Sequence, residues 1–234
     1  MILAAGMGTR LRPLTDSLPK CLMPLAGRPL LDWTLTWLRS CGVRECVMNL
    51  HYLPDMVMDF VGDGAQYGMM VQYSYEEELL GTAGAVKKVA GFFDGPFYMI
   101  YADNFSRWNL VELKRVCEEN HAAVAMAVHW RNDVTQSGMV EMADDGRIMR
   151  LAEKPRAEDV TSHYVNAGFF YMQPEVLDYI PKDVYCDFSS DIFPIMLRAG
   201  EMIYAVKMAE PIIGIDTPDA YKEADALAKQ MSEE

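Results

Sequence analysis

The chain has 234 residues, a formal net charge of −13 and a hydrophobic content of 51%. This length allows one or two domains with a substantial core. The acidic balance argues against binding of nucleic acid, which needs a broad positive surface. No apolar run approaches the ~18 residues of a membrane span, and the opening residues lack the basic start and the length of a secretory signal. We therefore expect neither nucleic acid nor a membrane as a partner.

Strand-like and helix-like segments alternate through the first half of the chain. Short apolar runs bounded by turn residues predict strands, and helical periodicity predicts the helices between them. The predicted strands cover 1–5, 45–50, 70–75, 97–102 and 122–130, and the predicted helices cover 30–40, 55–61, 82–92 and 110–120. This βαβ order predicts an α/β fold, with a Rossmann-like, mixed but mostly parallel sheet flanked by helices.

The second half of the chain has a different pattern. Gly138–Ala143, Arg147–Glu153 and Val165–Met172 are typical of hairpin strands and predict a small β-rich subregion. A helix-rich end follows. Its last helix begins at Thr217-Pro218, where a capping hydroxyl precedes a proline in the first turn, and runs to about residue 231.

The cysteines give an expectation about redox environment. There are five, with no CxxC pair and no zinc-ligand spacing: Cys21, Cys41, Cys46, Cys117 and Cys186. An odd number of scattered cysteines is typical of a reducing compartment, so we expect small buried thiols and a cytoplasmic protein.

Positive charge gathers at the start of this acidic chain. Through residue 31 it carries Arg10, Arg12, Lys20 and Arg28 against Asp16. This stretch has a net charge of +3, so the remainder carries −16. Such segregation indicates a local site for a polyanion. An ordinary surface role stays open for Arg12 and Arg28.

Glycines follow the first predicted strand at the place where ligands bind in open parallel sheets. Gly6 and Gly8 allow a tight bend, and their N–H groups can cradle phosphate oxygens. The dinucleotide-binding motif is the obvious alternative, but Leu11 stands where its third glycine would be. No G-K-[ST] follows, which excludes a Walker loop.

Longer blocks now resemble a known family. The stretch "LAAGMGTRLRPLTDSLPKCLMPLAGRPLL" is similar to the signature of the sugar-1-phosphate nucleotidylyltransferases. Within that family, "NLHYLPDMVMDF" and "YEEELLGTAG" resemble the mannose-1-phosphate guanylyltransferases most. The likeness continues through "ELLGTAGAV", "YADN", "SGMVEMADDGRI", "LAEKP", "VNAGFFYM" and "GIDTPDAY". It implies one catalytic domain over 1–234, with a nucleotide-binding part at about 1–120, a sugar-binding part at about 121–234 and no C-terminal β-helix domain.

The resemblance implies the reaction of an NTP with a sugar-1-phosphate, giving an NDP-sugar and pyrophosphate. The nucleophile is already an anion, so catalysis needs positioning and charge neutralisation. The implied catalytic residues are Arg10 for the departing pyrophosphate, Lys20 for the α-phosphate and Asp103. The implied nucleotide-binding residues are Leu3, Ala4, Ala5, Gly6, Gly8, Thr9, Arg10, Lys20, Gly81, Thr82 and Gly84.

Two carboxylates are expected to hold Mg²⁺, which prefers oxygen ligands and bridges phosphates. Asp103 ends the apolar run "FYMIYAD", although relatives usually have glycine where Ala102 stands. Asp216 is the second expected ligand. Gly214 and Asp216 stand in exchanged order compared with many relatives, and Asp219 is an alternative as a cap or ligand.

Three blocks supply the sugar side by resemblance. Glu153 and Lys154 would bind the sugar hydroxyls and the sugar phosphate, and Asn166 and Gly168 would line the pocket that Gly138 closes. A carboxylate or amide suits a polyol, and a cation suits a phosphate. An exposed charge pair is the alternative for Glu153 and Lys154.

The block "GTAG" resembles the guanylyltransferases, so we expect GTP and mannose-1-phosphate. A heptose-1-phosphate guanylyltransferase and an amino-sugar-1-phosphate uridylyltransferase stay open. So does a non-catalytic, nucleotide-sugar-sensing subunit, which the exchanged Gly214 and Asp216 would suit. The sequence leaves the oligomeric state open and is compatible with a homo-oligomer.

Overall fold

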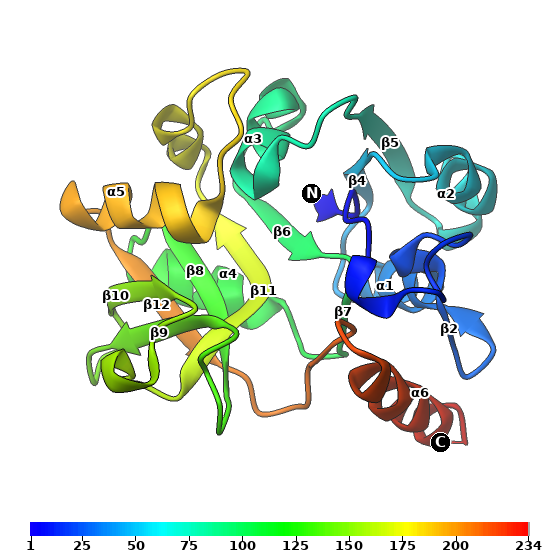
Figure 1. Ribbon diagram of the computed structural model, residues 1–234. Coiled ribbons are helices and arrows are strands. Elements are labelled where there is room, and N and C mark those ends of the chain that lie inside the picture. Colours follow the sequence, from blue (N-terminus) through cyan, green and yellow to red (C-terminus); the bar gives the residue numbers. More distant parts are fainter. Residues whose placement is uncertain (234) are drawn as a thin grey trace. The chain divides into compact units, whose positions relative to one another are not determined.

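The computed structural model describes residues 1–233, which form two compact units (Figure 1). Among the described residues, unit 1 comprises 1–79, 101–107 and 210–233, and unit 2 comprises 80–100 and 108–209. Both units are discontinuous because the chain returns to unit 1 twice. The division of labour expected on either side of residue 120 stays a prediction, since these units are defined by packing alone.

A parallel sheet organises unit 1. Its strands are β1 (Ile2–Leu3), β4 (Glu45–Leu50) and β5 (Met70–Tyr75). Strand β4 lies between the other two, and Leu3 is in register with Asn49. The crossovers carry α1 (Leu30–Ser40) and α2 (Pro54–Val61), as the sequence predicts.

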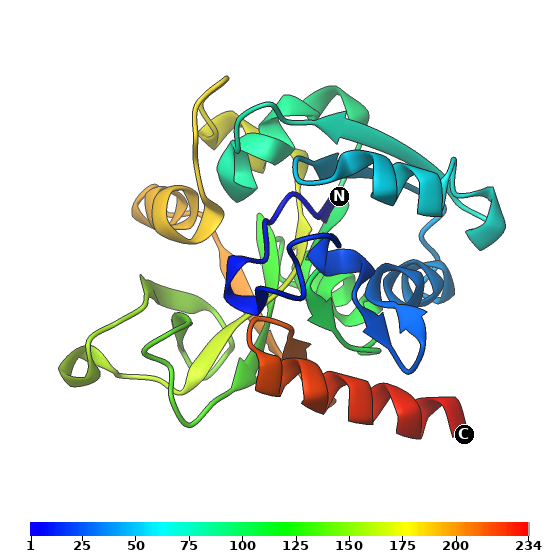
Figure 2. The same ribbon diagram turned by 45° about the vertical axis from the view of Figure 1, so that its right-hand side comes forward.

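Shorter elements of unit 1 surround the end of this sheet. Strands β2 (Pro24–Leu25) and β3 (Arg28–Pro29) pair as a hairpin, and β7 (Asn104–Phe105) pairs with β13 (Ile213–Gly214). Helix α6 (Pro218–Glu233) lies against the β2–β3 hairpin, as Figure 2 shows. The short helices of unit 1 are η1 (Thr9–Leu11), η2 (Lys20–Leu22) and η3 (Ala65–Tyr67).

One apolar cluster joins the segments at this end of unit 1. Leu11 comes from η1, Phe105 from β7 and Ile215 from the turn after β13, and each is at most 1% exposed. Ala224 and Ala228 of α6 complete the contact from the last helix. Burial of these side chains therefore fixes together three stretches that are distant in sequence.

Unit 2 contains a mixed sheet. Strand β8 (Val124–Trp130) pairs antiparallel with β11 (Tyr164–Met172) and parallel with β12 (Ile203–Lys207). Strand β11 also pairs with β6 (Phe97–Tyr101) and β9 (Gly138–Met142), and β9 pairs with β10 (Ile148–Glu153). The other elements are α3 (Gly81–Lys88), η4 (Ala90–Phe92), α4 (Val111–Glu119), η5 (Ala157–Asp159), η6 (Pro174–Tyr179), a π-helical turn at Phe188–Ile192 and α5 (Phe193–Arg198).

The predicted fold class is confirmed, since strands alternate with helices and the sheet is mixed, mostly parallel and flanked by helices. The β-rich subregion has its own small core of Val134, Met139 and Val165. Strand β12 was missed. Four of the five free cysteines are buried, whereas Cys41 is partly exposed. Within residues 1–233 no helix is long and apolar enough to cross a membrane.

The cluster around Ile215 gives a first testable prediction. Ile215→Ala should lower the free energy of unfolding by about 2–5 kcal/mol, because it leaves a cavity among fully buried side chains. Urea unfolding followed by circular dichroism measures this loss. Val111→Ala, at a side chain that is 45% exposed, should change the same quantity by roughly 0.5 kcal/mol or less. Equal losses in the two variants would contradict the packing role.

Candidate active site

The glycine loop begins where β1 leaves the sheet. Gly8 has a φ of 61°, in the left-handed region, and the helical turn η1 follows it. The Gly8 carbonyl accepts hydrogen bonds from the Leu11 amide at 2.9 Å and from the buried Thr15 hydroxyl at 2.8 Å. A Cβ atom on Gly8 would lie 3.1 Å from Thr15 Cγ2 and 3.2 Å from Lys20 Cβ. The loop therefore folds back closely on the segment that carries Lys20.

Two distant carboxylates meet through a short antiparallel ladder. Asp103 precedes β7 and Asp216 follows β13, and these two strands pair with Gly214 opposite Asn104. The Ile215 amide also donates a hydrogen bond to the Asp103 carbonyl at 2.9 Å. The exchanged order of Gly214 and Asp216 is thus compatible with a carboxylate at the site.

Lys20 lies between these two carboxylates. Its Nζ atom is 2.6 Å from Asp103 Oδ2 and 2.7 Å from Asp216 Oδ1. Its side chain is only 9% exposed. Burial alone would lower the pKa of Lys20, but the charges and hydrogen bonds of Asp103 and Asp216 more than offset burial and raise it above its ordinary value. Lys20 is therefore a permanent buried cation near neutral pH.

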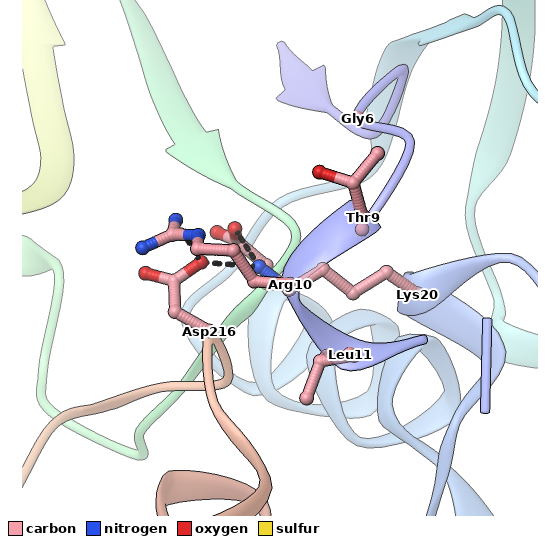
Figure 3. A pocket seen from close by; sticks show the side chains of 8 residues that line it. Gly6, Thr9, Arg10, Leu11, Lys20 and Asp216 are labelled. Atoms are coloured by element: carbon pink, nitrogen blue, oxygen red, sulfur yellow. Dashed lines mark hydrogen bonds and ion pairs between the residues drawn. The ribbon is translucent and has the colours of Figure 1, made fainter. Parts of the chain in front are cut away.

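Arg10 adds an exposed positive charge at the edge of the same site. Its guanidinium lies 2.7 Å from Asp216 Oδ1, and its side chain is 67% exposed. Figure 3 shows the Arg10 and Lys20 side chains reaching Asp216. A pocket of about 190 Å³ opens here, lined by Gly6, Gly8, Thr9, Arg10, Leu11, Lys20, Asp103 and Asp216.

The convergence of Asp103 and Asp216 also bears on metal binding. Oxygens of both carboxylates come within 2.7 Å of one atom, Lys20 Nζ. Among residues 1–233 no cluster of three or more His, Cys, Asp or Glu side chains could form a complete metal cage. Two hard oxygen ligands fit Mg²⁺, which commonly uses one or two carboxylates and completes its shell with phosphates and water.

Several predicted residues of unit 1 lie outside the pocket lining. The peptide groups of Leu3 and Ala4 support the loop by hydrogen bonds instead. Arg12 pairs with Asp16, and Arg28 pairs with Asp32 and lies 4.2 Å from the centre of the Trp33 ring. Asp219 is 93% exposed and contacts Lys222. These charges have local surface partners.

The glycines at the start of α3 lie close to backbone atoms of residues 184–186. A Cβ on Gly81 would lie 2.5 Å from the Cys186 carbonyl oxygen, and one on Gly84 would lie 2.7 Å from that of Val184. The Cys186 carbonyl accepts the amides of Ala83 and Gly84. The spacing of these glycines is thus explained by packing against 184–186, and their role in nucleotide binding stays a prediction.

Thr82 lies in the same turn and is held by a residue that the sequence reasoning missed. Its amide and its hydroxyl each lie 2.9 Å from Asp187 Oδ1. The Thr82 hydroxyl in turn accepts the Phe188 amide. The only sequence signal for Asp187 was an acidic residue ahead of a helical pattern.

The predicted sugar residues gather within unit 2. Glu153 is in register with Gly138 across the β9–β10 hairpin, and a Cβ on Gly138 would lie 2.9 Å from Glu153 Oε2 and 3.7 Å from Asn166 Cβ. Gly168, with a φ of 73°, donates its amide to Asn166 Oδ1 at a bulge of β11. The Asn166 amide group donates to the Ser189 hydroxyl at 3.3 Å.

Glu153 and Lys154 have unusual surroundings for a surface pair. Burial raises the pKa of Glu153, helped by the charge of Asp187 and opposed by Lys154. Lys154 has a φ of 46°, a conformation that few non-glycine residues adopt, and its amide donates to the Ser137 carbonyl. Both side chains are exposed, as the alternative of an exposed charge pair expects, and the constrained backbone at Lys154 is the feature that is typical of a functional site.

The two loop glycines give a matched pair of variants. Gly8→Ala should lower the free energy of unfolding by about 1–3 kcal/mol, because its φ is left-handed and the new methyl group meets Thr15 and Lys20. A Cβ on Gly6 meets no atom within 4 Å, so Gly6→Ala should change stability by less than about 1 kcal/mol. Thermal and urea unfolding compare the two. A larger loss for Gly6→Ala would contradict the close approach at Gly8.

Known proteins resemble this chain over most of its length. The family profile described as "Nucleotidyl transferase" matches residues 1–226. The UTP–glucose-1-phosphate uridylyltransferase of Synechocystis sp. is 32% identical over 89% of this chain and 57% of its own length. The mannose-1-phosphate guanylyltransferase of Mycobacterium tuberculosis is 30% identical over 97% of this chain and 63% of its own length. The chain thus spans about three fifths of these relatives.

Solved structures share the fold. A putative glucose-1-phosphate thymidylyltransferase from Bacillus anthracis superposes with a TM-score of 0.87 at 22% identity, over 97% of this chain and 94% of its own. HddC from Yersinia pseudotuberculosis superposes with a TM-score of 0.81 at 23% identity, over 97% of each chain. Together with the glycine loop and its buried lysine, the profile match places this chain in the nucleotidyl transferase family, among proteins related to sugar-1-phosphate nucleotidylyltransferases.

Proposed function

We propose that this protein transfers a nucleotidyl group from an NTP to a sugar-1-phosphate, with GTP and mannose-1-phosphate as the preferred pair. The observation that carries the proposal is the buried Lys20 cation, which lies between Asp103 and Asp216 beside a glycine loop. A loop that can bind anions and a fixed cation suit two phosphate substrates. The relationship to sugar-1-phosphate nucleotidylyltransferases supports this reaction class.

The reaction needs no general base. A phosphate oxygen of the sugar-1-phosphate forms a bond to the α-phosphorus of the NTP. The bond from that phosphorus to the oxygen that bridges the α- and β-phosphates breaks, and this oxygen leaves as a terminal oxygen of pyrophosphate. The nucleophile enters as an anion and pyrophosphate leaves as an anion, so the chain must hold two polyanions together. Lys20 would stabilise the charge at the α-phosphate, and Arg10, which is exposed, would hold the departing pyrophosphate.

Mg²⁺ is the proposed cofactor, and Asp103 and Asp216 would hold it. Bound there, it would neutralise charge on the phosphate oxygens. The two carboxylates also keep Lys20 protonated by raising its pKa. Asp103 and Asp216 therefore act on the phosphates in two ways, as ligands of the cation and as partners of the lysine.

The sugar-1-phosphate is proposed to bind at the cluster of Gly138, Glu153 and Asn166 in unit 2, with Gly168 shaping its wall and Lys154 binding the phosphate. Carboxyl and amide groups can accept and donate the hydrogen bonds of a polyol. The raised pKa of Glu153 reflects partial burial. The Glu153 side chain is exposed, so its oxygens are accessible to the hydroxyl groups of a sugar.

The preference for guanine and mannose is supported by the relatives. Mannose-1-phosphate guanylyltransferases from Mycobacterium tuberculosis and Arabidopsis thaliana are 30–32% identical to this chain. The Synechocystis relative named as a uridylyltransferase favours a second candidate, transfer from UTP to glucose-1-phosphate. Heptose-1-phosphate, an amino-sugar-1-phosphate and a non-catalytic sensing role are further alternatives that one assay separates.

The assay crosses five nucleotides, GTP, UTP, CTP, ATP and dTTP, with mannose-, glucose-, N-acetylglucosamine- and heptose-1-phosphates in the presence of Mg²⁺. Pyrophosphate release is expected to be fastest with GTP and mannose-1-phosphate. Release with another pair would keep the reaction and correct the specificity. Nucleotide binding without release from any pair would overturn the enzymatic proposal and favour the sensing subunit.

Lys20→Met tests the buried cation. We expect kcat/KM to fall by about 10²–10³, the effect typical of removing one preorganised charged donor. Lys222→Met is the matched control, because Lys222 is 76% exposed and pairs only with Asp219 among the ion pairs of the described residues. Steady-state kinetics on both proteins, each with its unfolding midpoint recorded, measure the effect. Equal activity in the two variants would remove Lys20 from the mechanism.

A further inference from the structure

One peptide group at the end of β1 is held from both sides. The Leu3 carbonyl accepts a hydrogen bond from the Ala102 amide at 3.0 Å, and the Ala4 amide donates to Asn49 Oδ1 at 2.8 Å. The Leu3 carbonyl and the Ala4 amide belong to the same planar peptide unit, so the two hydrogen bonds together fix its orientation. Ala102 immediately precedes Asp103, and Ala4 lies two residues before Gly6. This peptide group therefore connects the glycine loop with the segment that carries Asp103.

Beyond the end of β1, the side chain of Asn49 supplies the acceptor for the Ala4 amide in place of a backbone carbonyl of the neighbouring strand. Strands β1 and β4 are paired in parallel at Ile2 and Leu3, and β1 ends at Leu3. Asn49 is 4% exposed and its neighbours in β4, Met48 and Leu50, are buried apolar residues. A buried amide in such surroundings is unfavourable unless its polar atoms are paired. Both polar atoms of the Asn49 side chain have a partner, since Oδ1 accepts from the Ala4 amide and Nδ2 donates to Glu76.

Glu76 sets which way the Asn49 amide points. Asn49 Nδ2 donates to Glu76 Oε1 at 2.8 Å, and Glu76 is 1% exposed. A carboxylate accepts hydrogen bonds and does not donate them, so it selects the NH₂ group of the amide. The oxygen of the amide must then face the Ala4 amide. Glu76 follows β5 directly, and its carbonyl lies 2.8 Å from the ring nitrogen Nδ1 of His51.

From this chain of contacts we propose that Asn49, oriented by Glu76, is a positioning residue for the nucleotide-binding loop. It fixes the direction in which the backbone leaves β1 and so sets where the amides of Gly6 and Gly8 point. The inference rests on the proposed function in naming a nucleotide as the ligand. The held peptide group itself is independent of any ligand.

The polarity of the network can be reversed with almost no change in side-chain size. In Asn49→Asp, two carboxyl groups face one another in a buried site, and the contact to Glu76 loses its donor. When Asn49→Asp is combined with Glu76→Gln, the net charge of the pair is the native one. The new carboxylate at position 49 still accepts from the Ala4 amide, and the new amide group at position 76 donates to that carboxylate. Glu76→Gln alone keeps an oxygen to which Asn49 can donate.

Two measurements test the hydrogen bonds that join Ala4, Asn49 and Glu76. Hydrogen exchange of the Ala4 amide reports the held peptide group directly, without substrate. We expect exchange at least roughly tenfold faster in Asn49→Asp and near the native rate in the double variant and in Glu76→Gln. Steady-state kinetics should show the KM for the nucleotide raised at least roughly fivefold in Asn49→Asp, with the KM for the sugar-1-phosphate within about twofold, and the nucleotide KM restored in the double variant.

Thr34→Val controls for a general loss of stability. It removes a buried hydroxyl that donates only to the Leu30 carbonyl of its own helix among the hydrogen bonds assigned within residues 1–233. It should leave both KM values and the Ala4 exchange rate near native.

The proposal is overturned if Ala4 exchange is unchanged in Asn49→Asp, if the double variant fails to restore it, or if both KM values shift together. If the native protein shows no transfer with any pair, the proposed function fails. Ala4 exchange then decides the positioning proposal alone, since it needs no turnover.

Discussion

The ion triplet of Asp103, Lys20 and Asp216 is the constraint around which unit 1 is arranged. A lysine that is 9% exposed would be unfavourable without partners, and its two carboxylates would repel one another without it. Lys20 lies 83 positions from Asp103 and 196 positions from Asp216 in sequence, so the triplet forms only when three distant segments of unit 1 come together. This electrostatic requirement of unit 1 therefore coincides with its candidate site.

Apolar packing and a short ladder satisfy that requirement. The β7–β13 pair places Asp103 and Asp216 side by side, and the Leu11, Phe105 and Ile215 cluster holds the ladder against the glycine loop. A core of this kind resists small displacements, because a close-packed interior has few alternative arrangements. Solvent screens the attraction between Arg10 and Asp216, whose side chains are both over a third exposed, so packing contributes to holding Asp216 in place.

Much of this arrangement could be predicted from the sequence, and the failures have physical reasons. Periodicity predicted α1, β4 and β5 with their observed bounds, because each has a clear apolar face or run. Asp103 was predicted from its place after a buried strand. The convergence of Asp103 and Asp216 on Lys20 could not be predicted. It depends on the pairing of β7 with β13, which involves two residues from each strand and has no local sequence signal. Gly81 and Gly84 signalled a close approach, but only the fold identifies 184–186 as the partner. Strand β12 was missed because the sequence around it was interpreted as rich in helix.

Asn49 and Glu76 show a second way in which sequence reasoning falls short. A single asparagine in a buried strand, or the first of three glutamates, has a plain interpretation as tolerated polarity. Its significance lies in the direction of its hydrogen bonds, which depends on what the neighbouring strands present. Here the buried Glu76 carboxylate orients the Asn49 amide, and that amide orients the peptide group between Leu3 and Ala4. This peptide group lies between the glycine loop and Asp103, a proposed metal ligand. Polar groups in the interior of this sheet therefore specify the direction of the backbone, which apolar packing alone leaves free.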